Sequence, residues 1–357
     1  MNRSPRKGHH PPVFIERSEG LVTIVLNRPK ALNSLTLDMI RTIHGAFEAA
    51  EADPSIRLIV FRGEGDRGFC AGGDVKALAR AAAEGRLGEV LAFFREEYAL
   101  DLRIHRGSKL VAVVADGITM GGGLGLAAGA DVVLATERTH MAMPETRIGF
   151  FPDVGATGWL FRKCPPGYPE YLALTGYDLI GCECVRVGLA THCVPSHRLP
   201  EILAAFKAQA VHLPDGEGKA GAESLKTLLQ AFDLGPSAPQ PDRDAWVRTY
   251  FSGKTHIAEI LEGLRECGVR NRLCDDVFHR LSERSPTALV ATLKLLRHNQ
   301  GRPLEEVFEA DLRAAATLIR HPDYTEGVRA RLIDKDDRPQ WRPPSIEDVG
   351  TLEDLEL

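Results

Sequence analysis

The residues best suited to chemistry lie in the middle of the chain. A glycine-rich segment, residues 118–125, runs into an apolar stretch of helical character, and the carboxylates Glu145 and Asp153 follow it. A glycine loop that opens a helix leaves backbone N–H groups available to an anionic group. Two carboxylates close by can serve as general acid and base or as a nucleophile. The combination predicts an oxyanion stabiliser beside a base, as hydrolysis or enolate chemistry on a thioester requires.

A second glycine segment lies earlier in the chain, at residues 69–74. Gly72 and Gly73 permit a ligand to approach the backbone closely, and Asp74 is placed to cap a helix that begins near residue 75. Taken alone, this segment could equally be a capped turn without a ligand. The presence of two such loops favours a shared anion site.

The loop at residues 121–125 has two other interpretations. Its small residues could serve a close contact between helices, and Gly123-x-Gly125-x-x-Ala128 loosely matches a dinucleotide-binding fingerprint. A Rossmann loop follows its strand directly, whereas several residues separate the strand expected to end near Ala115 from the first glycine. The spacing therefore disfavours a dinucleotide.

Both carboxylates lie among apolar residues, where a charged group is either desolvated at a cost or kept for a function. Each also has a structural alternative. Glu145 could pair with Arg147 or Arg138, and Asp153 could cap a helix near Thr157. Spacing alone leaves these alternatives open.

The surrounding pattern alternates strands and helices, which indicates an α/β or α+β core. Thr36 is expected to cap the first helix, which ends at Asp53-Pro54. The other expected elements are strands at 21–26, 58–61, 110–115 and 131–135 and helices within 75–107 and after the glycine loop.

The second half of the sequence is expected to be mainly helical. Strand-like runs nearly vanish after about residue 165, and amphipathic stretches appear at 199–210, 224–232 and 255–265. Polar Pro/Gly-rich stretches at 212–219 and 235–242 indicate exposed loops. We therefore divide the chain into a flexible tail (1–12), a core (13–210), a helical C-terminal region (211–343) and an acidic tail (344–357).

Composition limits the class of protein. With 357 residues, 44% hydrophobic, 26% charged and a net charge of −5, the chain is typical of soluble globular proteins, and nucleic acid is a disfavoured partner. No apolar run is long enough for a membrane span, and the basic start lacks the hydrophobic stretch of a secretory signal. Seven cysteines, an odd number, suggest no disulfide framework, so we expect reduced thiols and a cytoplasmic location.

Other candidate residues are weaker. Cys182, Cys184, His192 and Cys193 include possible metal ligands, but their spacing departs from the usual zinc patterns, so no metal site is predicted. Cys70, beside the expected anion site, could be a reactive thiol or an apolar filler.

Several motifs together resemble the crotonase (enoyl-CoA hydratase/isomerase) superfamily. Within it, three further segments are similar to the 3-hydroxyisobutyryl-CoA hydrolase group, and the likeness extends from residue 13 to about 343. The superfamily motifs are Asn27-Arg28-Pro29, residues 69–74, residues 117–123 and Met143-Pro144-Glu145; the segments of the hydrolase group are residues 93–98, 151–155 and 327–336.

The resemblance implies a spiral of strand-strand-helix turns that binds an acyl-CoA, with the thioester oxygen held by the backbone amides of Gly73 and Gly122. It further implies that Glu145 attacks the carbonyl or activates water, that Asp153 orients the substrate hydroxyl or the water, and that Glu97 lines the acyl pocket. CoA would be part of the substrate, with no separate cofactor. Superfamily members commonly form trimers or paired trimers, so a homo-oligomer is a possibility.

One departure from the hydratase pattern is informative. Hydratases carry a second glutamate where this chain has Gly125, and without it the handling of water across a double bond loses one carboxylate. Hydrolysis of a short 3-hydroxyacyl-CoA, with 3-hydroxyisobutyryl-CoA of valine breakdown as the implied substrate, is therefore favoured over hydration. Isomerisation with Asp153 as the acid, and a noncatalytic acyl-CoA-binding protein, are the alternatives.

Overall fold

The computed structural model describes residues 11–213, 218–268, 271–350 and 352. The predicted flexible tail thus lies outside the described residues except for Pro11 and Pro12, whose carbonyl oxygens accept hydrogen bonds from Asn27 (2.8 Å each). Within the described residues, no helix is both long and apolar enough to cross a membrane.

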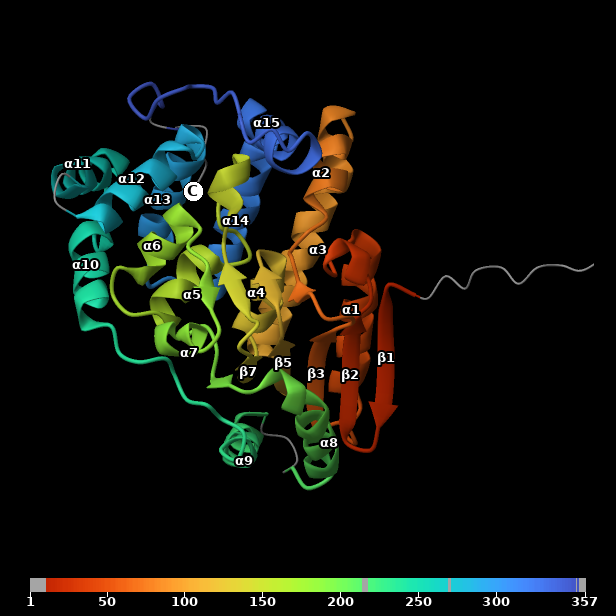
Figure 1. Cartoon of the computed structure of the whole chain (residues 1–357). Coiled ribbons are helices and arrows are strands. Elements are labelled where there is room, and N and C mark those ends of the chain that lie inside the picture. Colours follow the sequence, from red (N-terminus) through yellow and green to blue (C-terminus); the bar gives the residue numbers. More distant parts are fainter. Residues whose placement is uncertain (1–10, 214–217, 269–270, 351, 353–357) are drawn as a thin grey trace, which may run out of the picture.

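A six-stranded sheet forms the centre of the fold (Figure 1). Its order is β1 (Val13–Ser18), β2 (Leu21–Leu26), β3 (Leu58–Gly63), β5 (Leu110–Ala115), β7 (Val132–Ala135) and β10 (His192–Cys193). Only the β1–β2 pair is antiparallel. Every residue of β2 and β5 is buried, as expected for parallel strands covered on both faces. The predicted strands are confirmed; β1 was missed because three consecutive apolar residues are followed by three polar ones, so the strand has no alternating pattern.

A second, smaller sheet positions the chemistry. It contains β4 (Gly68–Cys70), β6 (Ile118–Met120), β8 (His140–Ala142) and β9 (Leu179–Ile180) in that order. The neighbours β4 and β6, and β6 and β8, are parallel, so these three strands end at the same edge of the sheet. The two glycine turns and the segment containing Glu145 follow those three strand ends directly. Three-residue strands are too short for periodicity to reveal, and the sequence analysis missed them.

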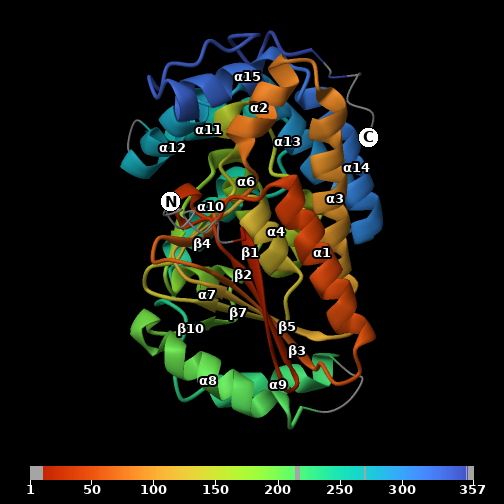
Figure 2. The ribbon, with the colours of Figure 1, turned by 90° about the vertical axis from the view of Figure 1, so that its right-hand side faces the viewer.

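Helices cover both faces of the large sheet (Figure 2). On one side lie α1 (Leu37–Ala52), α2 (Val75–Ala83), α3 (Leu87–Arg106) and α4 (Gly122–Ala128), and α3 packs against both α1 and α4. On the other side, α8 (Leu199–Ala210) and α9 (Gly218–Leu229) bury Ile202, Phe206 and Leu225 against the sheet. The Thr36 hydroxyl accepts a hydrogen bond from Met39 N (3.3 Å), which confirms its predicted cap.

The remaining helices confirm the mainly helical second half. They are α5 (Ala156–Lys163), α6 (Tyr168–Thr175), α7 (Glu183–Val187), α10 (Pro241–Phe251), α11 (Ile257–Gly268), α12 (Arg272–Ser282), α13 (Pro286–Asn299), α14 (Leu304–Leu318) and α15 (Pro322–Val328). Short helical turns lie at η1 (Pro29–Ala31), η2 (Glu145–Ile148), η3 (Ser196–Arg198) and η4 (Arg329–Ile333). Because α14 packs on α3, and α15 on α2 and η2, the C-terminal helices lie against the elements that carry the predicted site (Figure 1).

Two loop predictions need correction at their ends. The stretch predicted at 212–219 already enters α9 at Gly218, and its residues 214–217 lie outside the described residues. The stretch predicted at 235–242 ends at Gln240, because α10 begins with Pro241. Proline is favourable in the first turn of a helix, where its missing N–H leaves no bond unmade. The division of the chain at residues 210/211 and 343/344 stays a prediction.

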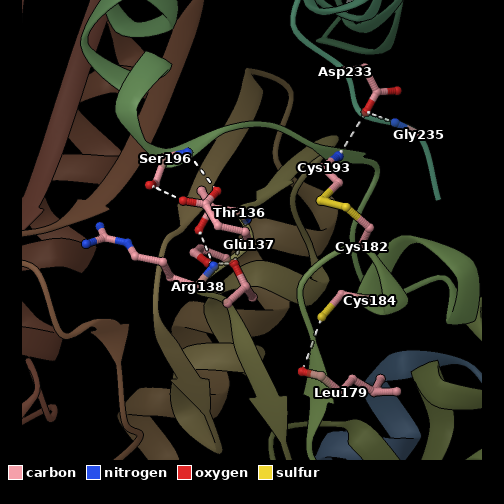
Figure 3. The surroundings of a disulfide bond; sticks show 12 residues. Thr136, Glu137, Arg138, Leu179, Cys182, Cys184, Cys193, Ser196, Asp233 and Gly235 are labelled. Carbon is pink, nitrogen blue, oxygen red and sulfur yellow. Dashed lines mark hydrogen bonds between the residues drawn. A yellow bond between two sulfur atoms is a disulfide. The ribbon is translucent and has the colours of Figure 1, made fainter. Parts of the chain in front are cut away.

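Cysteine pairing differs from the prediction. The structure joins Cys182 to Cys193 and Cys267 to Cys274, so the expectation of reduced thiols is wrong for four of the seven cysteines. Figure 3 shows that the first disulfide links the segment before α7 to β10, where Cys193 N donates to Asp233 (3.0 Å). Pairing depends on which cysteines the fold brings together, and their number and spacing did not reveal it.

Asn33 connects the first glycine turn to the sheet. Asn33 is 1% exposed, and its backbone lies in the left-handed region (φ 56°). The side chain accepts from Arg28 N (2.8 Å) and donates to the carbonyl oxygens of Glu64 (3.1 Å) and Gly68 (2.9 Å). Leu35, two residues further along the chain, pairs with Gly73 in a parallel bridge. By holding the backbone just before Leu35, the side-chain amide of Asn33 therefore helps to position Gly73.

We predict that Asn33→Gly lowers the free energy of unfolding by about 3 kcal/mol, because three hydrogen bonds of a buried side chain are lost while glycine still tolerates the positive φ. Urea denaturation followed by circular dichroism measures this loss. Lys30→Gly, at an exposed position of the same loop, is the matched control and should lose less than about 1 kcal/mol. Equal losses in the two variants would contradict the assigned role.

Candidate active site

One cavity of about 750 Å³ collects the residues that the sequence analysis singled out. All five predicted site residues line it: Gly73, Gly122, Glu97, Glu145 and Asp153. Around them the wall consists of apolar side chains from α2, α3 and the 148–150 segment and of basic side chains from the C-terminal half. Residues far apart in sequence are therefore brought together in one cavity, while their roles stay a prediction.

The two glycine turns touch each other. A Cβ atom on Gly72 (φ 92°) would lie only 3.1 Å from Met120 O and 3.2 Å from Gly122 N, so a larger residue would push the turns apart. Gly121 also has a positive φ (51°), and a Cβ atom on it would in turn contact the Cα atom of Gly72. Glycine is required here for both the backbone conformation and the close contact.

The amides of Gly73 and Gly122 are left available by the local structure. Leu35 donates its N–H to Gly72 O (2.8 Å) and accepts from Asp74 N (2.9 Å), so the intervening Gly73 N–H points away from Leu35. Gly122 is the first residue of α4, and an N–H in the first turn has no partner within its helix. Asp74 accepts from Ala77 N (3.4 Å), which confirms its predicted cap.

Glu145 lies beside the second turn at the start of η2. Its side-chain Oε1 is 2.9 Å from the place where a Cβ on Gly121 would sit, and its Oε2 has no hydrogen-bond partner among the described residues. Burial raises the pKa of Glu145 well above its usual value, and the nearby charge of Asp153 raises it further. The structural alternative is not adopted, because Arg138 pairs with Asp116 and Arg147 with Asp337.

Asp153 accepts a hydrogen bond from the Tyr98 hydroxyl (2.7 Å) and is 6% exposed. Burial raises the pKa of Asp153 to about 7, and the Tyr98 hydrogen bond opposes that rise. Its carboxylate does not cap α5. Instead Asp311, on α14, accepts from Gly155 N (2.8 Å) at the start of that helix.

Two further carboxyls approach the glycine helix from α3. Glu97 and Asp101 are four residues apart and therefore lie on one face of that helix, 2% and 0% exposed. Glu97 Oε1 occupies the space that a Cβ on Gly122 would need, and Asp101 Oδ2 lies 2.6 Å from the place of a Cβ on Gly125. Burial and the charge of Asp153 raise the pKa of both groups well above the usual range.

Sequence reasoning missed Asp101, Tyr98 and Asp311. The only available signal for Asp101 was its spacing from Glu97 on an otherwise apolar helix face. Asp311 lies far from Asp153 in the sequence. Only the tertiary structure shows that it contacts the segment just after Asp153. Cys70 is buried beneath the second turn, and burial raises the pKa of its thiol to about 12, consistent with an apolar filler.

Two of the four residues considered as possible metal ligands, Cys182 and Cys193, form a disulfide. The sulfurs of Cys182 and Cys193 are bonded to each other, and the Cys184 thiol faces Leu179 O (3.5 Å) (Figure 3). Among the described residues, no group of three or more His, Cys, Asp or Glu side chains is arranged to hold a metal ion.

Comparison with known proteins agrees with this fold. The profile of the enoyl-CoA hydratase/isomerase family matches residues 21–355, and the chain belongs to that family. Among solved structures, a carnitinyl-CoA dehydratase from Mycobacterium thermoresistibile superposes with a TM-score of 0.85 at 34% identity, covering 97% of this chain and 96% of that one. The predicted family and fold class are confirmed.

The curated relatives are more specific. The chain is 37% identical over 349 residues to a protein of Gallus gallus named 3-hydroxyisobutyryl-CoA hydrolase, mitochondrial, covering 95% of this chain and 86% of the relative. It is 40% identical over 348 residues to the Rattus norvegicus protein of the same name, covering 96% and 87%. The likeness thus extends over the glycine turns, over the four buried carboxyls Glu97, Asp101, Glu145 and Asp153, here called the carboxyl cluster, and over the C-terminal helices.

The carboxyl cluster predicts how stability depends on pH. The pKa of Asp153 is about 7 in the folded protein and near 3.8 when unfolded, so its contribution is full below pH 3.8 and is lost as pH rises through about 7. We expect the substrate-free protein to lose free energy of unfolding, on the order of a few kcal/mol, between pH 5 and pH 8.

Urea denaturation at the two pH values measures this loss. Asp153→Asn should flatten the dependence, because it removes one titrating group and the charge that raises the pKa of Glu97 and Glu145. An unchanged slope in this variant would mean that the group at position 153 does not titrate in this range.

Proposed function

We propose that this protein hydrolyses a short 3-hydroxyacyl-CoA thioester to the free acid and CoA, with 3-hydroxyisobutyryl-CoA as the substrate. The names of the curated relatives support the substrate. The observation that carries the chemistry is the position of Glu145 beside the Gly121–Gly122 turn, within the cavity that Gly73 also lines. A carboxylate next to two available backbone amides is the arrangement that cleavage of a thioester requires.

In this proposal the thioester oxygen accepts hydrogen bonds from the amides of Gly73 and Gly122, which stabilise the negative charge that develops on it. Glu145 takes a proton from water as the water oxygen bonds to the carbonyl carbon. The carbon–sulfur bond then breaks, and the departing sulfur receives that proton. Glu145 could instead attack the carbon itself and form an anhydride that water cleaves. Its raised pKa makes it a stronger base and nucleophile than an exposed glutamate.

Asp153, held by Tyr98, is proposed to orient the 3-hydroxyl group or the water, and Glu97 to line the acyl pocket opposite. Because several buried carboxyls adjoin one another, each raises the pKa of its neighbours and the group titrates together rather than residue by residue. A protonated carboxyl can donate a hydrogen bond as well as accept one, which suits a hydroxyl group in the acyl chain.

Hydration of an enoyl-CoA is disfavoured by the space around Gly125. A side chain there would meet Asp101 Oδ2 at 2.6 Å and Val154 Cβ at 2.8 Å, so the second glutamate of hydratases has no room. Isomerisation with Asp153 as the acid and a noncatalytic acyl-CoA-binding role are the remaining alternatives. The first would change the absorbance of an enoyl-CoA without releasing thiol, and the second would bind CoA and turn nothing over.

We predict that Glu145→Gln reduces thiol release from 3-hydroxyisobutyryl-CoA by at least about 10³-fold, because the neutral amide is neither base nor nucleophile. Binding of CoA, followed by titration calorimetry, should persist. The control is Glu96→Gln on the exposed side of α3, where Glu96 pairs with Arg41 (2.7 Å). Unchanged turnover in Glu145→Gln would remove Glu145 from its role.

Asp153→Asn should lower kcat by about 10²-fold or more, because its carboxylate no longer orients the hydroxyl group or the water. It should also move the acidic limb of the pH–rate profile to lower pH, since a nearby negative charge no longer raises the pKa of Glu145. Steady-state thiol release from pH 5 to 9 measures both effects. An acidic limb that stays in place would show that the two carboxyls do not interact.

Cellular context is a separate proposal. We retain the cytoplasm as the expected location, although the curated relatives are named mitochondrial, and we propose that no cofactor beyond the CoA of the substrate is needed. A homo-oligomer, trimer or hexamer, stays a prediction from the family. Fractionation of cells that express the native protein, and light scattering of the purified one, would test location and assembly.

A further inference from the structure

The segment that follows Asp153 is a strained turn. Ala156 N donates to Asp153 O (2.9 Å), and both residues between them have a positive φ, 52° for Val154 and 76° for Gly155. Glycine adopts this conformation freely, but a β-branched residue such as valine adopts it rarely and at a cost in free energy. Val154 is also completely buried. Such a backbone persists only where the surrounding structure holds it in place.

A hydrogen-bond network that includes two C-terminal helices holds this turn. Asp311 of α14 accepts from Gly155 N (2.8 Å) with one carboxyl oxygen and from the Thr157 hydroxyl (3.1 Å) with the other. The Thr157 oxygen accepts in turn from the side-chain amide of Asn299, the last residue of α13 (2.8 Å). Asp311, Thr157 and Asn299 are completely buried, and we call these three residues the turn anchor.

The turn anchor requires a carboxyl group at position 311. Thr157 has a single hydroxyl proton, and it donates that proton to Asp311 while its oxygen accepts from Asn299. Asp311 therefore faces a donor at each of its two oxygens. An asparagine at this position would direct its NH₂ group at one of those donors, so one of the two hydrogen bonds would be lost. Loss of either bond leaves a buried donor without its acceptor.

Helix α14 also contacts Asp153 by a second route. Phe308, on the same helix as Asp311, packs against the Tyr98 ring with the ring centroids 5.9 Å apart. Tyr98 in turn donates its hydroxyl to Asp153 (2.7 Å). A Cβ atom on Gly155 would lie 2.8 Å from Phe308 Cζ, so the phenyl ring touches the turn as well. One helix thus contacts both the backbone of the turn and the hydrogen-bond partner of the Asp153 carboxylate.

We propose that Asp311 is a positioning residue, which holds the turn at residues 153–155 so that the Asp153 carboxyl group faces the cavity and stays beside Tyr98. This proposal rests on the proposed function, in which Asp153 orients the substrate hydroxyl group or the water. Asp311 itself does not line the cavity, so its effect on the reaction passes through Asp153. The alternative is a cap that stabilises α5 without any effect on the chemistry.

A double-mutant cycle on kcat separates these two roles. Asp311→Asn and Thr157→Val each break the turn anchor, and Thr157→Val changes no charge. We expect either variant to lower kcat for 3-hydroxyisobutyryl-CoA roughly 10- to 100-fold, with less than about a threefold change in KM. In the Asp153→Asn background no carboxylate remains to be positioned, so either substitution should lower kcat by less than about twofold. Each kcat refers to folded protein, quantified by circular dichroism.

Two matched variants serve as controls. Thr157→Ser keeps the hydroxyl group and should rescue the loss of kcat seen in Thr157→Val. Glu309→Gln removes a carboxylate from the exposed face of the same helix and should leave kcat unchanged. An unchanged kcat in folded Asp311→Asn, or an equal fold loss in the two backgrounds, would overturn the proposal. If Asp311→Asn does not fold, the comparison of Thr157→Val with Thr157→Ser in both backgrounds decides.

A spectroscopic measurement reports on the turn without any turnover. The chain has three tryptophans, and the indole N–H of Trp159 donates to Val154 O within the strained turn (2.9 Å). The indole groups of Trp246 and Trp341 donate elsewhere, to a cysteine sulfur of α12 and to a carbonyl oxygen beyond it. The three indole signals in a nitrogen–proton correlation NMR spectrum, assigned with Trp159→Phe, therefore include one probe of the turn and two internal references.

This measurement separates the proposal from the proposed function. We expect the Trp159 signal to shift in Asp311→Asn and in Thr157→Val, and to keep its position in Thr157→Ser, while the two reference signals stay in place. If the wild type releases no thiol from any thioester, the proposed function fails, yet this pattern of shifts would still support Asp311 as the residue that holds the turn. A Trp159 signal that keeps its position in both Asp311→Asn and Thr157→Val would reject that role.

Discussion

Parallel pairing of three short strands is the constraint on which the candidate site depends. Since β4, β6 and β8 run in the same direction, the segments that leave them begin at one edge of the sheet. This pairing places the first glycine turn, the second glycine turn and Glu145 beside one another, although each comes from a different part of the sequence. The turns can touch only because Gly72 and Gly121 have no side chains. The contact between the two glycine turns and Glu145 thus follows from backbone hydrogen bonds and the absence of a few Cβ atoms.

Burial of carboxyl groups without paired cations gives the site its chemical character. Most proteins offset a buried carboxylate with an arginine or lysine, but among the described residues Glu97 Oε1, both carboxyl oxygens of Asp101 and Glu145 Oε2 have no hydrogen-bond partner. The carboxyls consequently hold their protons more tightly than exposed ones do. Such groups destabilise the folded protein at neutral pH, which is a common property of functional sites. The hydrogen bond from Tyr98 to Asp153 offsets part of this cost, and Asp311 accepts from Gly155 N at the start of α5.

The C-terminal helices do more than cover the core. Helix α14 packs on α3 and contributes Asp311, while α15 packs on α2 and on η4. Tyr324 and Arg331, from α15 and η4, line the cavity, so these C-terminal segments form part of its wall.

The sequence by itself determined the central strands, the helical second half, the caps at Thr36 and Asp74, and the five residues Gly73, Gly122, Glu97, Glu145 and Asp153 that line the cavity. These features follow from local periodicity, from capping and from motifs contiguous in the chain. Only the tertiary structure decided the three-residue strands, the two disulfides and the carboxyls Asp101 and Asp311. Each of those depends on which backbone segments and side chains the fold brings into contact, and residue type and spacing along the chain do not carry that information, even for cysteines that are 11 and 7 residues apart.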